Sequence, residues 1–130
     1  MQKQSQGGAF SGCTNLTSVT LPSTLTSIQY GAFSGCSNLP SITIPAGVPS
    51  LADDTFNGCN ALSSVTFADG SQLTTIDRRV FENCSSLSTI TLPSTLTSIS
   101  DYAFKNCSGL TSINIPSNVT SIGSGAFNGA

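Results

Sequence analysis

The sequence contains no histidine and very little charge. Charged side chains make up 8% of the 130 residues, and the formal net charge is −2. Without a cluster of Lys and Arg the chain cannot neutralise a run of phosphates, so no binding to nucleic acid is expected. Without histidine there is no histidine base, and the cysteines do not have the spacing of two to four residues that zinc ligands usually have. Ser and Thr are so frequent that no single hydroxyl stands out as a nucleophile. We therefore predict a protein that is not an enzyme and that has no catalytic residue, metal site or cofactor.

Long apolar runs are also missing. No stretch approaches the about 20 residues that cross a bilayer, so we predict no membrane insertion. Residues 1–6 are polar, lack the apolar stretch of a secretion signal, and do not follow the pattern of the remaining chain. We interpret residues 1–6 as a tag or a truncation scar, and residues 7–130 as a single domain.

Phenylalanine recurs at a nearly fixed interval along the chain, with spacings of 23, 23, 25, 23 and 23 residues. The recurring positions are Phe10, Phe33, Phe56, Phe81, Phe104 and Phe127. A cysteine follows three residues after each of the first five, and Ala130 takes that place after the last. A fixed period of this length is typical of a solenoid, in which single units stack because none can bury its apolar side chains alone.

Each unit contains two short extended segments and a turn. Val19-Thr20-Leu21 and its equivalents alternate apolar and polar residues and are rich in β-branched side chains, which predicts a half-buried strand. Proline follows this strand in four units, where the chain must turn a corner. In the third unit the longer segment 68–72 replaces the proline corner. A second extended segment, such as 96–99, leads to a single helical or 3₁₀ turn around Ala103-Phe104.

These residues resemble a known family. From Leu110 to Phe127 the chain reads Leu-x-x-Ile-x-Ile-Pro-x-x-Val-x-x-Ile-Gly-x-x-Ala-Phe, and the earlier units add Cys three residues after Phe. This pattern is similar to the BspA-like (treponemal-type) leucine-rich repeat. The resemblance implies a mostly β, right-handed leucine-rich-repeat solenoid of about five 23-residue coils. It also implies a parallel sheet on the concave side, short 3₁₀ or helical turns near each Ala-Phe, and relatives that are mostly bacterial or protist surface proteins, some of them adhesins.

The five cysteines can be interpreted in two ways. Stacked one above another, they could lie within disulfide distance. Their number is odd, however, and stacked side chains point the same way, which favours free thiols that act as small apolar groups. The predicted buried thiol column consists of Cys13, Cys36, Cys59, Cys84 and Cys107.

The charged residues gather near the recurring phenylalanines. Equivalent positions of successive units carry opposite signs, so we predict a structural ladder of charge between repeats that fixes register and adds about 0–1 kcal/mol per exposed pair. The ladder consists of Asp53, Asp54, Arg78, Arg79, Glu82, Asp101 and Lys105.

The outward positions of the first strand provide the candidate binding face, because they form two columns of small polar side chains. They are Ser18, Thr20, Ser41, Thr43, Ser64, Thr66, Thr89, Thr91, Ser112 and Asn114. Such residues are also simply soluble and compatible with a strand exterior.

We expect a protein-binding or adhesion module of a cell-surface or secreted protein, whose partner is a protein of a host or neighbouring cell, or a glycan. The alternatives are a structural spacer within a larger surface protein, and a flat face that binds glycan or ice. Neither end of the chain shows a polar cap, so head-to-tail self-association is a further possibility.

Overall fold

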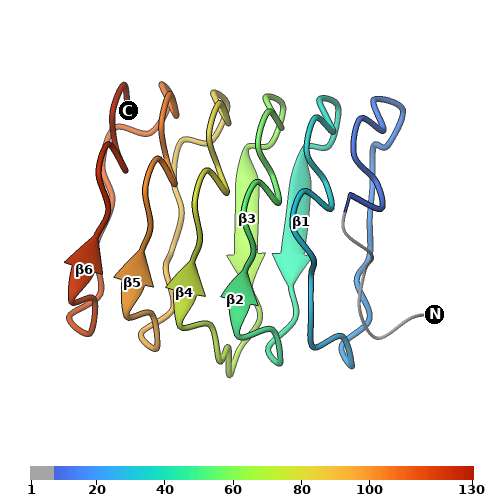
Figure 1. The fold of residues 1–130 in the computed structure, drawn as a ribbon. Helices are drawn as coiled ribbons and strands as arrows, with labels where there is room; N and C mark the ends of the chain where they lie inside the picture. Colours follow the sequence, from blue (N-terminus) through green and yellow to red (C-terminus); the bar gives the residue numbers. More distant parts are fainter. Residues whose placement is uncertain (1–7) are drawn as a thin grey trace.

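The structure is a computed structural model that describes residues 8–130. The chain winds into a row of coils that lie side by side, with the first and last described coils at opposite ends of the row (Figure 1). We number the coils from each phenylalanine: coil 1 is 10–32, coil 2 is 33–55, coil 3 is 56–80, coil 4 is 81–103 and coil 5 is 104–126. The interpretation of residues 1–6 lies outside the described residues.

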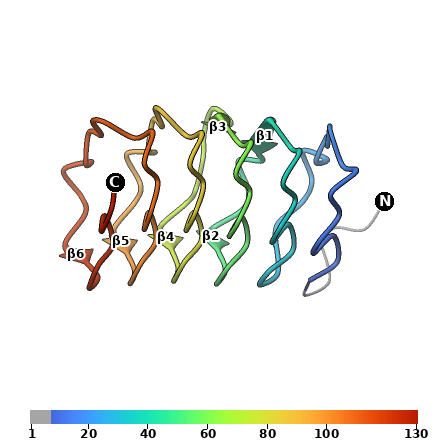
Figure 2. The same cartoon turned by 90° about the horizontal axis from the view of Figure 1, so that it is seen from above.

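Two parallel sheets run along the row, as the repeat pattern predicts. The second extended segments form a four-stranded sheet in the order β2 (Ser50–Leu51), β4 (Thr75–Ile76), β5 (Ser98–Ile99) and β6 (Ser121–Ile122). The first extended segments of coils 2 and 3 pair as β1 (Ser41–Ile44) and β3 (Ser64–Phe67). Seen from above, the two sheets lie on opposite sides of the row (Figure 2). We call the side that carries β1 and β3 the β1–β3 face.

The predicted sheet of first strands is shorter than the repeat pattern suggests. Within residues 8–130 only coils 2 and 3 pair through this segment. The backbone N–H of Ala68 donates to the carbonyl oxygen of Ile44 at 3.0 Å and closes the end of this ladder. The other four coils have proline at the position of Ala68: Pro22, Pro45, Pro93 and Pro116. Because proline has no N–H, this hydrogen bond cannot form between the other coils.

The turn around each phenylalanine differs from the predicted helical or 3₁₀ turn, since the described residues contain no helix. In coil 3 the backbone N–H of Cys59 donates to the carbonyl of Phe56 at 3.0 Å, and Gly58 between them has φ +80°. The residue two positions after each of the six recurring phenylalanines is left-handed, and it is Gly or Asn. A left-handed residue inside each turn prevents the segment from continuing as a helix.

The core is built from columns of equivalent residues. The phenylalanine rings stack with centroids 5.2–5.6 Å apart from Phe10 to Phe127. The rings of the four inner phenylalanines are fully buried. Backbone hydrogen bonds hold the same spacing, for example from the N–H of Phe56 to the carbonyl of Val80 at 2.9 Å. Backbone hydrogen bonds therefore connect neighbouring coils along the whole edge that carries these turns. On the β1–β3 face of the described residues they connect only coils 2 and 3.

Candidate functional site

All ten residues predicted for the binding face are exposed. In β1 and β3 they alternate with buried side chains, since Ile42 and Val65 point into the core and the hydroxyl residues point outward. The parallel register places Ser41 beside Ser64, and Thr43 beside Thr66. None of the ten is charged. The structure therefore exposes all ten side chains. Four of them, those on β1 and β3, lie side by side on a hydrogen-bonded sheet.

The remaining predicted face residues of coils 4 and 5 do not extend that sheet. A groove of about 390 Å³ separates the end of β3 and the corner that follows it in coil 3 from Thr91 and the residues that follow it in coil 4. A second groove, of about 300 Å³, lies on the other side of Thr91 and borders Asn114 of coil 5. No backbone hydrogen bond joins 88–92 to 64–67 or to 111–115 within the described part of the chain. The expected continuous plane is thus interrupted on both sides of Thr91, and within residues 8–130 coil 1, which carries Ser18 and Thr20, does not pair with coil 2 through this segment either.

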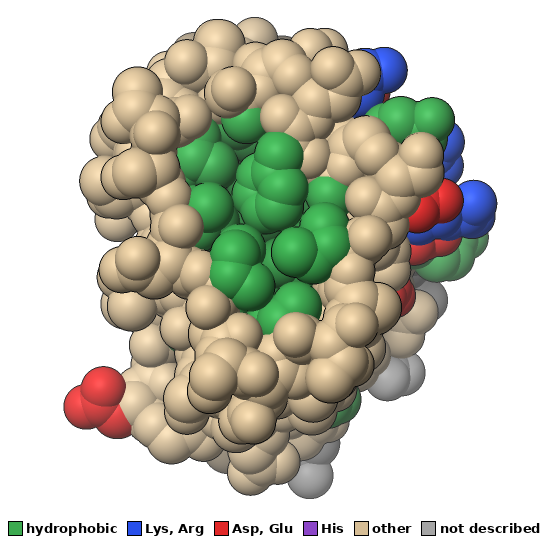
Figure 3. Space-filling model, turned by 90° about the vertical axis from the view of Figure 1, so that its left-hand side faces the viewer, with side chains coloured by type: hydrophobic (Ala, Val, Ile, Leu, Met, Phe, Trp, Pro, Cys, Tyr) green, Lys and Arg blue, Asp and Glu red, His purple; other side chains and the backbone are tan. Residues whose placement is uncertain are grey.

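Apart from Asp69, the charged side chains of residues 8–130 lie on the turn edge, away from the β1–β3 face. In the view onto the end of the row, the blue and red side chains gather mostly along one edge (Figure 3). Arg78 Nη2 lies 3.4 Å from Asp53 Oδ2, and Arg79 Nε lies 3.0 Å from Asp54 Oδ1. The hydrogen bond from Arg79 to Asp54 raises the pKa of the guanidinium above its usual value.

The predicted pairing extends no further among residues 8–130. The Asp101 carboxylate accepts a hydrogen bond from the backbone N–H of Ser124 at 2.8 Å instead of binding an arginine. Lys105 Nζ lies 5.1 Å from the centroid of the Tyr102 ring and forms no ion pair with Glu82. Among residues 8–130 the charge ladder therefore joins only coils 2 and 3.

The cysteines are free, and four of them are fully buried. Each buried thiol donates to the carbonyl oxygen of a phenylalanine one coil earlier, at 3.0–3.2 Å. Cys13, in coil 1, is only half-buried. Burial raises the pKa of Cys59 and of Cys107 to about 12, and it also raises the pKa of Cys36 and Cys84. Because the thiolate is the reactive form, these four thiols are unreactive at neutral pH.

Other site classes find little support in the described part of the chain. Residues 8–130 hold no group of three or more His, Cys, Asp or Glu side chains placed to bind a metal ion. The same residues include no helix that is long and apolar enough to span a bilayer.

Two features were not predicted from the sequence. The groove between coils 3 and 4 was missed, although the longer corner at 68–72 was visible as a break in the repeat. The left-handed backbone conformation of the residue two positions after each recurring phenylalanine was also not predicted. Gly or Asn at this constant distance from phenylalanine is a usable signal for it.

Comparison with known proteins gives a consistent result. A family profile described as the BspA type leucine rich repeat region matches residues 4–130 in six copies. No curated protein matches the chain at a significant level.

Three solved structures are similar to this chain. A leucine-rich repeat protein from Eubacterium ventriosum is 38% identical over 94% of this chain, with a TM-score of 0.86. The leucine rich repeat protein of T. pallidum is 33% identical over 85%, with a TM-score of 0.77. A leucine rich cell surface protein from Faecalibacterium prausnitzii is 26% identical over 95%, with a TM-score of 0.57. The chain covers 32%, 53% and 48% of these three proteins respectively, so it spans about half of their length or less.

Proposed function

Because this chain belongs to the BspA-type leucine-rich repeat family, we propose that it is a non-enzymatic binding segment of a cell-surface or secreted protein. Its β1–β3 face contacts a protein on a host cell or a neighbouring cell. The surface location is supported by the similar protein of F. prausnitzii, which is described as a cell surface protein.

The observation that carries this proposal is the exposed hydroxyl pattern on β1 and β3. Threonine side chains on a paired strand are stiff at χ1, so little side-chain entropy is lost when a partner covers them. The buried residues between them fix the strands on the core. By contrast, the charged edge already pairs its arginines with aspartates, and a partner would have to displace those contacts.

A binding measurement with two double variants tests the proposal. Purified extracellular-matrix proteins and whole cells are exposed to the immobilised chain, and any partner found is titrated. We expect Thr43→Arg with Thr66→Arg to abolish binding, because two long charged side chains stand on the contact face. The control, Arg78→Ala with Arg79→Ala, should keep affinity within a few-fold. Affinity should also change little with salt, since exposed charges are the interactions that a Debye length of about 8 Å screens.

Three outcomes would contradict this assignment. Loss of binding in the arginine control would move the site to the charged edge. Full binding by the threonine variant would exclude the β1–β3 face. Absence of any partner among the matrix proteins and cells would favour a spacer.

A further inference from the structure

The groove between coils 3 and 4 is where this chain departs most from its own repeat. Coil 3 contains 25 residues where the other coils contain 23, and its corner reads Phe67-Ala68-Asp69-Gly70-Ser71 instead of a proline turn. Gly70 has φ +79°, a conformation that allows the longer corner to bend back toward the coil. Phe67 stands where the other coils carry Leu or Ile. The two extra residues of coil 3 and the larger side chain of Phe67 thus both lie at the corner that follows β3.

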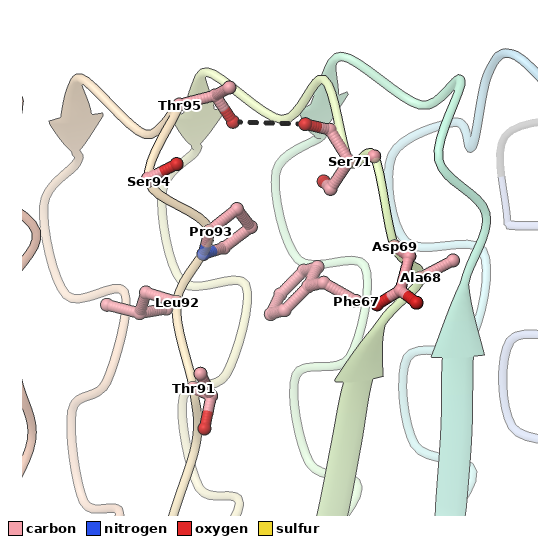
Figure 4. A pocket seen from close by; sticks show the side chains of 10 residues that line it. Phe67, Ala68, Asp69, Ser71, Thr91, Leu92, Pro93, Ser94 and Thr95 are labelled. Atoms are coloured by element: carbon pink, nitrogen blue, oxygen red, sulfur yellow. Dashed lines mark hydrogen bonds between the residues drawn. The ribbon is translucent and has the colours of Figure 1, made fainter.

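The groove combines an apolar wall with a polar rim. Phe67 extends from the end of β3 toward Leu92 and Pro93 of coil 4, and its ring is only half-buried (Figure 4). One end of the groove is closed by Thr95 Oγ1, which donates to the carbonyl of Leu73 at 2.6 Å and to that of Ser71 at 3.4 Å. The volume of about 390 Å³ lies in the range of small-molecule sites.

Asp69 supplies the only charge among the lining residues. It is the one acidic residue that lies away from the turn edge, and its side chain is exposed. Within the described part of the chain no Lys, Arg or hydrogen-bond donor engages its carboxylate. An unpaired carboxylate in the same groove as an aromatic ring disfavours an anionic ligand and favours one that donates hydroxyl hydrogen bonds, which are short and strong toward a carboxylate.

We propose that this groove binds one ring of a neutral carbohydrate. The C–H face of a pyranose ring covers the exposed part of Phe67 and Pro93, two of its hydroxyls donate to Asp69, and Thr91 and Ser94 contact the remaining ones. Within residues 8–130 the backbone groups of Thr91 and Leu92 form no backbone hydrogen bond, so they add further donors and acceptors along the same wall. The groove borders the β1–β3 face, but binding of a sugar in it does not depend on the protein-binding role proposed for that face.

Saturation-transfer difference NMR tests the groove with four neutral disaccharides: cellobiose, maltose, lactose and di-N-acetylchitobiose. We expect saturation transfer to ring C–H protons of at least one of them at millimolar concentration, with shifted amide signals at Phe67, Asp69 and Gly70. Phe67→Leu restores the side-chain type that the other coils carry, so the variant should fold. It should weaken binding about tenfold, and Asp69→Asn should weaken it to a similar extent.

Tyr30→Leu is the matched control, because Tyr30 is an exposed aromatic residue outside the groove. It should bind as the parent does. Three results would overturn the proposal: no saturation transfer to any of the four sugars, equal binding by the two groove variants, or a short uncharged peptide that shifts the same amide signals while the sugars do not. Because these variants leave Thr43 and Thr66 intact, failure here is distinguishable from failure of the protein-binding role.

Discussion

Each buried cysteine joins two coils at a single carbonyl oxygen. The carbonyl of Phe56 accepts the backbone N–H of Cys59 in its own coil at 3.0 Å. It also accepts the thiol of Cys84, one coil later, at 3.2 Å. A serine could form the same bond but would cost more to bury, whereas alanine would leave the oxygen with one partner. Cysteine is thus the side chain that satisfies a buried acceptor while remaining nearly apolar.

The buried thiols predict a loss of stability in alkaline solution. Burial raises the pKa of Cys59 from 9.0 to about 12, so the thiol ionises earlier in the unfolded chain than in the folded one. Its contribution to stability is full below about pH 9 and is lost as the pH rises toward about 12. We expect the free energy of unfolding, measured by urea titration at several pH values, to fall by about 1.4 kcal/mol per pH unit for this thiol.

Comparing variants isolates this effect from other titrating groups. Cys59→Ala should show a flatter dependence on pH than the parent between about pH 9 and 12. Thr66→Ala, which changes an exposed side chain without titrating there, should keep the slope of the parent. Equal slopes for Cys59→Ala and the parent would show that burial does not hold this thiol in its protonated form.

At the scale of the element, the turn after each phenylalanine depends on a backbone conformation more than on side-chain contacts. The residues at its left-handed position are Gly12, Gly35, Gly58, Asn83, Asn106 and Gly129. Glycine adopts this region without steric cost, and asparagine does so more easily than other residues. The position two before phenylalanine is also left-handed, and there Arg79 and Tyr102 occur with φ +58° and +59°. Neighbouring coils hold those strained residues in place through the backbone ladder.

Two glycine substitutions separate conformation from packing. At Gly58, with φ +80°, an added Cβ would lie 3.7 Å from Gly35, so space is available and only strain opposes the change. We expect Gly58→Ala to lower the free energy of unfolding by about 1–2 kcal/mol. At Gly47, whose φ is not left-handed, the nearest atom would lie 3.5 Å away. Gly47→Ala should be neutral or should raise stability by about 0.4–1 kcal/mol.

Urea denaturation of the two variants measures both effects. A destabilisation of similar size at Gly47 and Gly58 would mean that steric contact, and not the left-handed conformation, decides the glycine positions.

For the whole molecule, the two ends of the row differ from its middle. Ile122 is 48% exposed at the end of coil 5, and Phe10 is 41% exposed in coil 1, whereas the equivalent inner residues are buried. The view onto the end formed by coil 5 shows apolar side chains gathered at its centre (Figure 3). Among residues 8–130, the backbone N–H groups of Phe127 and Gly129 lack the partners that their inner equivalents have in the next coil. The carbonyls of Ala9 and Ser11, at the other end, are the matching acceptors.

This complementarity predicts that copies of the chain stack head to tail. Stacking would bury both apolar ends and continue the backbone ladder, as between any two neighbouring coils. We expect the sedimentation coefficient to rise with protein concentration in analytical ultracentrifugation. Ile122→Lys should keep the protein monomeric, because it places a charge within the contact. Thr43→Lys, on the β1–β3 face, should associate like the parent.

The opposite pattern would assign association to another surface. If Ile122→Lys associates normally and Thr43→Lys does not, the copies meet through the β1–β3 face. A parent chain that stays monomeric at every concentration would show that the exposed ends do not bind one another.

The sequence by itself determined the columns of this protein. A constant interval between equivalent residues forces Phe33 onto Phe56, Cys36 beside Cys59, and parallel strands beside one another, because stacked units of equal length bring the same positions together. The outward direction of Thr43 and Thr66 followed from strand alternation alone. These features depend only on order along the chain, so they could be predicted without coordinates.

Only the tertiary structure decided how closely neighbouring coils approach on each side. Whether two first strands pair depends on a donor such as Ala68 N–H meeting a particular carbonyl of the previous coil, and the prolines elsewhere remove that donor. The groove beside Phe67 and the limited charge ladder arise in the same way, from competition among several contacts across one interface. The repeat pattern fixes which residues face each other, but the sum of the hydrogen bonds and packing at each interface fixes the distance between them.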